Sequence, residues 1–206
     1  FVFLFMFDFD SHVARKNPAA VIEAFKLAFP WPSSIPVTLV IKSINGERHE
    51  KECNRLKNKI GGDSRILQIH EVLPHSINTA LMKCCDCYVS LHRSEGFGLT
   101  LAEAMLMGKP VITTGYSGNM DFTTSATALL VDYELVPVQP GDYPFSHGEM
   151  WAEPNVQQAC DYMLDLVEDS TFAQSLAQKG EKMIRTSFST TTMGDRYKKR
   201  LSNLLR

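Results

Sequence analysis

Apolar segments alternate with amphipathic ones along the chain, and each kind predicts a different element. Residues 1–9 are mostly apolar and aromatic and show no helical periodicity, which predicts a buried strand. Asn17 and Pro18 then give a helix N-cap and a proline at the first helical position, and the helix they start is stopped at Pro30. The same reasoning predicts a charged helix between the turns at 45–46 and 61–62, helices over 76–84 and 98–107, and strands over 36–41, 65–69, 86–91, 111–114 and 127–131.

Strands that alternate with helices at this spacing are joined by right-handed crossovers. The expected fold class is therefore α/β, with a Rossmann-like parallel sheet of about six strands and helices on both faces. Ligands bind to such sheets at the carboxyl ends of the strands. We expect residues 1–206 to form a single domain, in which residues 132–154, punctuated by proline and glycine, form a long loop. Three C-terminal helices are expected in residues 155–206, over 155–168, 171–186 and 190–205.

Composition and charge exclude several classes of protein. Apolar residues make up 44% and charged residues 21% of the chain, which excludes a disordered protein or a coiled coil. The net charge of −2 gives no general attraction to nucleic acid, so no nucleic-acid partner is expected. The apolar run Phe1–Phe7 is much shorter than the about 20 residues that span a bilayer, and it has no signal-peptide features. Because the chain begins with Phe, we expect it to be a fragment whose preceding part is missing.

The five cysteines are odd in number and unevenly spaced, which does not describe a secreted disulfide framework. The run Cys-Cys-Asp-Cys at 84–87 suggests a metal site, but structural zinc normally needs a second Cys or His pair. We therefore expect buried, reduced thiols, no metal site and a cytoplasmic location.

One stretch, residues 94–105, stands out because it follows a predicted strand and opens a helix. Gly96 and Gly98 allow the backbone to approach a ligand, and a helix N-terminus with free amides attracts phosphate. The flanking carboxylates, Glu95 and Glu103, would repel phosphate but accept hydrogen bonds from hydroxyl groups. A nucleotide-sugar, with a diphosphate between a sugar and a ribose, has this combination of groups. The simpler alternative is a helix N-terminus with Glu95 placed for the helix dipole and Glu103 in solvent.

Residues 95–114, Glu-Gly-Phe-Gly-Leu-Thr-Leu-Ala-Glu-Ala-Met-Leu-Met-Gly-Lys-Pro-Val-Ile-Thr-Thr, resemble the signature of the "group 1" family of retaining, nucleotide-sugar-dependent glycosyltransferases. Members of this family have two Rossmann-like domains in the GT-B arrangement, and nearly the whole chain resembles the C-terminal, donor-binding domain. The Arg-Lys-Asn-Pro segment at 15–18 and the Ser-Gly-Asn-Met-Asp turn at 117–121 resemble two further family segments.

The resemblance implies a role for each matching residue. Glu95 would contact the hydroxyls of the donor sugar, and Lys16 would neutralise the diphosphate; these two are the expected catalytic residues. The family usually has an arginine at position 11, which is Ser here, so Arg15 or Lys42 would have to supply that charge. The expected donor-binding residues are Gly96, Phe97 and Gly98 in the turn, Leu99 and Thr100 through their amides at the diphosphate, Glu103 at the ribose, Leu73 beside the base, and Arg15.

The expected activity is transfer of a hexosyl group from a UDP- or GDP-sugar to an acceptor hydroxyl, in polysaccharide or glycoconjugate synthesis. The acceptor, a glycan or a lipid-linked sugar, would bind to the missing N-terminal domain, so this fragment alone is expected to transfer no sugar. No metal or other cofactor is expected. The alternative function is a non-catalytic nucleotide-sugar-binding or regulatory module. For the basic residues of the last helix three interpretations stay open: a solvated face, contact with anionic lipid at the inner face of the membrane, or contact with the missing domain; these residues are Arg196, Lys198, Lys199 and Arg200.

Overall fold

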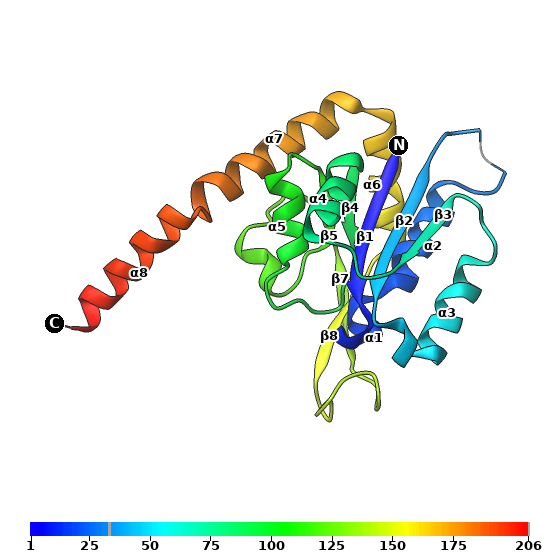
Figure 1. The fold of residues 1–206 in the computed structure, drawn as a ribbon, viewed down its shortest axis with the longest axis horizontal. Helices are drawn as coiled ribbons and strands as arrows, with labels where there is room; N and C mark the ends of the chain where they lie inside the picture. The colour runs from blue at the N-terminus through cyan, green and yellow to red at the C-terminus, as the bar shows by residue number, and fades with distance from the viewer. Residues whose placement is uncertain (33, 206) are drawn as a thin grey trace.

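The computed structural model describes residues 1–32 and 34–205, and β1 (Val2–Asp8) lies inside its main sheet (Figure 1). Six parallel strands follow the order β3-β2-β1-β4-β5-β6, which confirms the Rossmann-like α/β fold. β1 pairs with β2 along its whole length and with β4 on its other side. The remaining strands of the sheet are β2 (Thr38–Ile44), β3 (Ile66–His70), β4 (Cys87–Ser90), β5 (Val111–Thr114) and β6 (Leu129–Val131).

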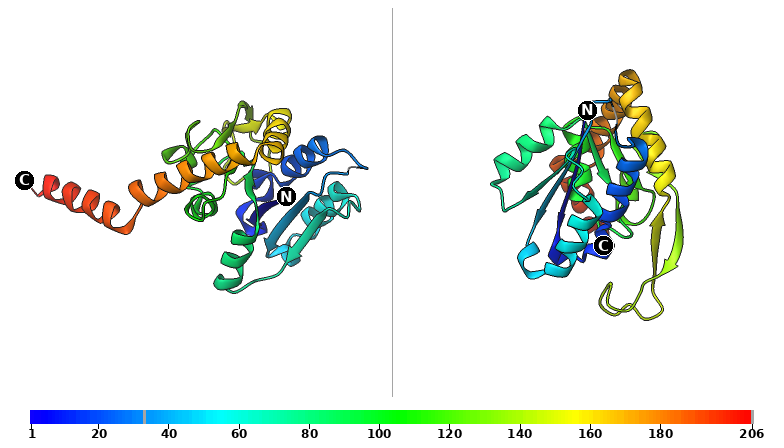
Figure 2. Two further views of the ribbon diagram at one scale, coloured as in Figure 1. Left: turned by 90° about the horizontal axis from the view of Figure 1, so that it is seen from above. Right: turned by 90° about the vertical axis from the view of Figure 1, so that its right-hand side faces the viewer.

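Helices cover both faces of the sheet, as expected from the alternating pattern (Figures 1 and 2). One face carries α2 (Pro18–Ala28), α3 (Glu50–Ile60) and α6 (Val156–Glu168). The other face carries α4 (His75–Cys84) and α5 (Leu99–Leu106). The three expected C-terminal helices are present: α7 (Ser170–Ser187) packs on both α6 and α5, and α8 (Thr190–Leu204) extends away from the body and has no buried residue.

Local sequence signals explain where several helices begin and end. The Asn17 side chain accepts a hydrogen bond from the amide of Ala20 at 3.3 Å, and Pro18 occupies the first turn of α2. Gly61 ends α3 with φ at +63°, a conformation that favours glycine. Side chains also cap the C-terminal helices, because Asn155, Asp169 and Ser189 accept from backbone amides at the starts of α6, α7 and α8.

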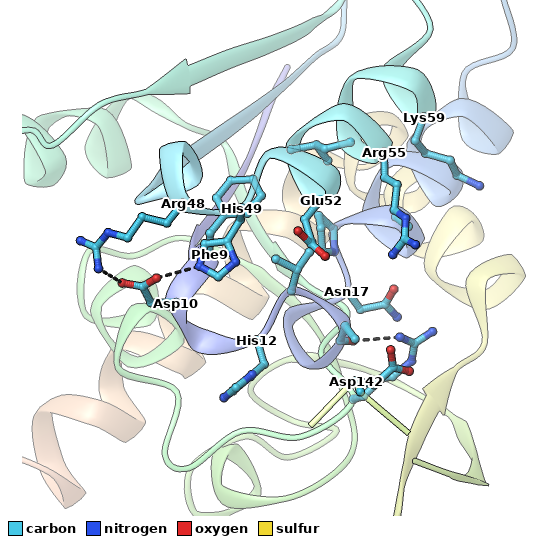
Figure 3. Close-up of a pocket in the computed structure, with 17 residues that line it drawn as sticks. Phe9, Asp10, His12, Asn17, Arg48, His49, Glu52, Arg55, Lys59 and Asp142 are labelled. Carbon is cyan, nitrogen blue, oxygen red and sulfur yellow. Dashed lines mark hydrogen bonds and ion pairs between the residues drawn. The ribbon is translucent and has the colours of Figure 1, made fainter. Parts of the chain in front are cut away.

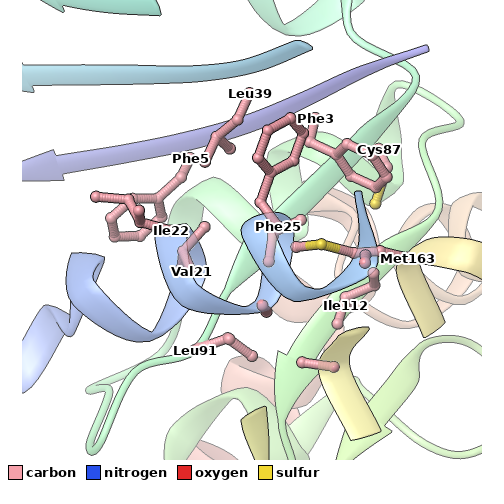
Figure 4. Packing of buried hydrophobic residues seen from close by; sticks show 14 of the residues in the cluster. Phe3, Phe5, Val21, Ile22, Phe25, Leu39, Cys87, Leu91, Ile112 and Met163 are labelled. Carbon is pink, nitrogen blue, oxygen red and sulfur yellow. The ribbon is translucent and has the colours of Figure 1, made fainter. Parts of the chain in front are cut away.

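Alternate residues of β1 enter two different cores, which explains why the strand is apolar on both faces. Phe3 and Phe5 pack against Phe25 of α2 and its neighbours (Figure 4), whereas Leu4 belongs to the cluster under α4 and α5. The Phe25 ring lies 6.2 Å from the Phe3 ring and 5.4 Å from the Phe29 ring, between centroids.

The expectation of an irregular loop over 132–154 is wrong at both ends of that segment. β7 (Tyr133–Pro137) and β8 (Met150–Pro154) form an antiparallel hairpin, and only residues 138–149 between them lack a named element. The hairpin was hidden in the sequence because β7 is exposed along most of its length, so its side chains need not alternate between apolar and polar. Only Trp151, Ala152 and Pro154 of β8 are buried.

The cysteines differ partly from expectation. All five are free, but Cys84 is exposed and Cys53 is only half-buried; Cys85, Cys87 and Cys160 are buried. Burial raises the pKa of the Cys85 thiol to about 12. Within residues 1–32 and 34–205, no group of three or more His, Cys, Asp or Glu residues could hold a metal ion. No helix of this described part is both long and apolar enough to cross a membrane.

Phe25→Ala should lower the free energy of unfolding by about 3–5 kcal/mol, because it removes a ring packed among aromatic neighbours at the centre of the larger core. Urea denaturation followed by circular dichroism would measure the loss. The matched control is Phe145→Ala in the 138–149 segment, where the ring is 99% exposed and the change should stay within about 0.5 kcal/mol. Equal losses in the two variants would contradict this packing.

Candidate functional site

The carboxyl ends of β1, β4 and β5 lie at one edge of the sheet because these strands are parallel neighbours. The segments that follow them are 9–17, 91–98 and 115–121. The first contains α1 (Val13–Lys16), a single helical turn that the sequence did not indicate. Most of the candidate residues lie in these three segments.

A charged cluster joins the first two segments. The Lys16 ammonium group donates a hydrogen bond to Glu95 Oε2, and Arg15 Nη1 lies 3.7 Å from Glu95 Oε1. Arg15 Nη1 also donates to the Ser94 carbonyl oxygen at 2.8 Å. The three charged side chains are 14–17% exposed, so the cluster is largely shielded from water but not sealed from it. Two cations face one carboxylate, which leaves a net positive charge.

Competing effects determine the protonation of Glu95. Burial alone would raise the pKa of its carboxyl group, but the hydrogen bond and charge of Lys16, with the charge of Arg15, outweigh burial and lower the pKa. A lowered pKa in the folded state stabilises the fold above the carboxyl's ordinary pKa, and this contribution is lost as the pH falls through the folded-state value. Glu95 is therefore ionised at neutral pH, when it can accept hydrogen bonds but donate none.

The third segment fixes the backbone of Glu95. The Glu95 amide donates to Ser117 Oγ at 2.7 Å, and the Gly118 amide donates to the Glu95 carbonyl oxygen at 3.0 Å. A side chain at Gly118 would overlap the carbonyl group of Gly96, so only glycine allows this close approach. Ser117 has a positive φ of 73°, which is unfavourable for serine and is maintained by the surrounding contacts.

Behind this backbone lies a buried polar network around His92. The Nδ1 atom of His92 lies 3.1 Å from Ser90 Oγ. The Nε2 atom of His92 lies 3.2 Å from the Tyr116 carbonyl oxygen and 3.1 Å from Asn119 Oδ1. Two oxygen acceptors at Nε2 place the ring proton there. Burial lowers the pKa of His92, so the ring is neutral at neutral pH and positions the Glu95 segment without carrying charge.

The Gly-Phe-Gly turn leads into the N-terminus of α5. Gly98 has φ at +90°, and no described side chain caps the helix after it. The first amides of α5 are therefore available to an anion. The Phe97 ring packs on Phe122 and Phe188, at centroid distances of 5.0 and 5.9 Å. Thr100 Oγ1 accepts a hydrogen bond from the buried Tyr88 hydroxyl at 2.9 Å.

Three residues from the sequence analysis lie outside the charged cluster. Glu103 is exposed, its side chain makes no hydrogen bond or ion pair with the described residues, and it lines a groove of about 600 Å³ together with Leu99 and Asp121. Leu73 is half-buried in the β3–α4 connection. Lys42 is buried in β2, and burial lowers its pKa, so Arg15 is the second cation of the Glu95 cluster.

Sequence reasoning missed the supporting groups of the site. The sequence indicates Ser117 and Asn119 only as part of a turn, although Asn119 Nδ2 donates to the Thr114 carbonyl oxygen at 3.0 Å and its Oδ1 faces His92. The available signal was a Ser-Gly-Asn sequence directly after a strand, because such residues supply turns and side-chain hydrogen bonds to loops.

Comparison with known proteins finds one matching family, described as "Glycosyl transferases group 1", over residues 10–183. A search of curated protein sequences finds no match. Anabaena Alr3699/HepE in complex with UDP and glucose superposes with a TM-score of 0.71 at 19% identity, over 98% of this chain and 48% of its own. The C-terminal domain of a group 1 family protein (LpcC) from Francisella tularensis gives 0.68 at 21% identity, over 92% of this chain and 87% of its own.

A glycosyltransferase from Rickettsia africae gives a TM-score of 0.72 at 18% identity, over 100% of this chain and 48% of its own. At these identities the structural likeness establishes the fold. This chain spans about half the length of the Anabaena and Rickettsia proteins.

Lys16→Met should raise the pKa of the Glu95 carboxyl group, because burial then acts against one nearby cation instead of two. Carboxyl carbon chemical shifts in protein labelled with ¹³C at glutamate, followed between pH 3 and 7, would measure the change. Lys51→Met on the exposed side of α3 removes the same charge and should leave Glu95 unchanged. An unaltered Glu95 titration in Lys16→Met would rule out the ion pair as its cause.

Proposed function

This chain belongs to the group 1 glycosyltransferase family, and we propose that it is the donor-binding domain of a retaining enzyme that uses a UDP- or GDP-sugar. The observation that carries the proposal is the convergence of Lys16 and Arg15 on Glu95 immediately before the uncapped start of α5. This arrangement combines an anion site with an ionised hydrogen-bond acceptor. A nucleotide-sugar needs both, for its diphosphate and its sugar hydroxyls.

In the proposed reaction, negative charge develops on the nucleoside diphosphate as the bond to the sugar breaks. Lys16 and the first amides of α5, at Leu99 and Thr100, would stabilise that charge, an effect that is often the largest single contribution to catalysis. Lys16 then has two acceptors, the Glu95 carboxylate and the diphosphate, and its ammonium group has enough donors to serve both.

The sugar and the nucleoside occupy different places in this proposal. Glu95 accepts hydrogen bonds from the sugar hydroxyls, next to the backbone of Gly96, Phe97 and Gly98. Glu103, which is exposed and unpaired among the described residues, accepts from the ribose hydroxyls, and Leu73 lies beside the base. The positive charge required by the diphosphate comes from Lys16, Arg15 and the helix start, so the proposed reaction uses no metal cofactor.

The acceptor is the second part of the proposal. The Anabaena and Rickettsia proteins are about twice as long as the segment they share with this chain. We propose that the hydroxyl of an acceptor glycan or lipid-linked sugar is presented by a further domain, and that hexosyl transfer occurs only when that domain closes over the donor and excludes water.

The two carboxylates should differ in which ligands they affect. Glu103→Gln should weaken both UDP and UDP-glucose, because the ribose is common to both, whereas Glu95→Gln should weaken only UDP-glucose. Hydrogen bonds to a charged acceptor are worth about 1.5–3 kcal/mol, so each loss should be about 10- to 100-fold in Kd. Isothermal titration calorimetry would measure it, with GDP and GDP-mannose as the second pair of ligands.

Glu134→Gln on the exposed strand β7 is the matched control and should leave every Kd unchanged. Equal weakening of UDP by Glu95→Gln and Glu103→Gln would contradict the assignment of Glu95 to the sugar. A lack of binding by all four nucleotides would reject the proposed donor class.

A further inference from the structure

A separate cavity of about 630 Å³ lies beside α1, and the proposed donor site does not use it (Figure 3). Val13 and Ala14 of α1 line it, whereas Arg15, Lys16 and Glu95 do not. The rest of its wall comes from segment 9–12, from residues 48–49, from the start of α2, from α3, from Arg93, and from Gly141 and Asp142 between the strands of the hairpin. One helical turn therefore contributes to two sites through different residues.

Two hydrogen-bond donors in this wall have no acceptor in the described part of the chain. Asn17 is 4% exposed, and its Nδ2 atom is buried without a partner. The guanidinium group of Arg55 makes no hydrogen bond or ion pair with any described residue, although Arg48, Lys59 and Arg93 around the same cavity all have carboxylate partners. In Figure 3, the guanidinium group of Arg55 points toward the side chain of Asn17. A guanidinium group without a partner is suited to a carboxylate or phosphate oxygen.

Hydrogen-bond acceptors are also available in the wall. The carboxylates of Glu52 and Asp142 have no partner among the described residues, and both line the cavity. By contrast, the carboxylate of Asp10 is already occupied by Arg48 at 3.2 Å and by His49 at 2.7 Å. Free carboxylates would repel a bare anion but accept hydrogen bonds from hydroxyl groups. The ligand that satisfies both sets of groups carries one oxyanion and several hydroxyls.

Hydrogen bonds of Arg93 hold one wall of the cavity in place. Arg93 donates from Nε to Glu153 at 2.6 Å and from Nη1 to the Ala14 carbonyl oxygen at 2.8 Å, which fixes the wall between α1 and the hairpin. At the rim, the His12 ring lies 4.8 Å from the Tyr143 ring, between centroids. The volume is within the range of pockets that hold small molecules.

We propose that this cavity is a second ligand site that binds a monosaccharide unit bearing a carboxylate or a phosphate. Arg55 holds the oxyanion, and Glu52 and Asp142 accept from the sugar hydroxyls. The site is independent of the donor nucleotide, because neither Lys16 nor Glu95 lines this cavity.

The test is binding of four probes to the protein by NMR titration: glucuronate, glucose 6-phosphate, glucose and inorganic phosphate. We expect glucuronate or glucose 6-phosphate to bind at least about 10-fold more tightly than both glucose and phosphate, and the better of the two identifies the oxyanion. Arg55→Gln should weaken that ligand about 10-fold or more. Lys57→Gln, which removes the same charge from α3 outside the cavity, should not change it.

UDP titration of the same samples separates this proposal from the donor site. We expect the Kd for UDP to be the same in Arg55→Gln as in the unaltered protein, and UDP not to displace the anionic sugar. The proposal is overturned if no probe binds at millimolar concentration, if glucose or phosphate binds as well as the anionic sugars, if Arg55→Gln and Lys57→Gln behave alike, or if UDP displaces the sugar.

Discussion

The ion pair between Lys16 and Glu95 joins parts of the chain that are 79 residues apart. A carboxylate removed from water is costly unless a cation and further hydrogen bonds compensate for the lost hydration. The need to compensate Glu95 brings α1 against the segment after β4, where the Arg93 amide also donates to the Arg15 carbonyl oxygen at 2.8 Å. Gly118 and Ser117 then bring the segment after β5 to the same place. The position of α5 and the wall of the separate cavity both depend on these joined segments.

Most of the fold could be predicted from the sequence because its elements carry strong local signals. Central parallel strands are apolar on both faces, and Asn17-Pro18 and Gly61 mark helix ends by their backbone preferences. The hairpin β7–β8 and the single turn α1 could not be predicted in this way. Main-chain pairing and tertiary contacts hold them, and neither depends on a periodic pattern of side chains.

The candidate site was predictable where its residues are close in sequence and was not where they are distant. Residues 95–100 form one turn and one helix start, so their arrangement could be predicted from their spacing. The pairing of Glu95 with Lys16 was not foreseen, although each residue had been selected separately. The cavity around Arg55 was not foreseen at all, because its wall comes from segments spread between residues 9 and 142. Such a surface exists only after the crossovers have brought those segments together.

The position of β1 between β2 and β4 has a consequence for the order in which the chain folds. β1 can pair with β2 once the chain has been synthesised as far as Ile44. It can pair with β4 only after synthesis has reached Ser90. At a synthesis rate of about 5–20 residues per second, one edge of a phenylalanine-rich strand stays unpaired for several seconds. A strand with that composition readily pairs with other chains. The sheet order therefore leaves this edge of β1 open until β4 has been made.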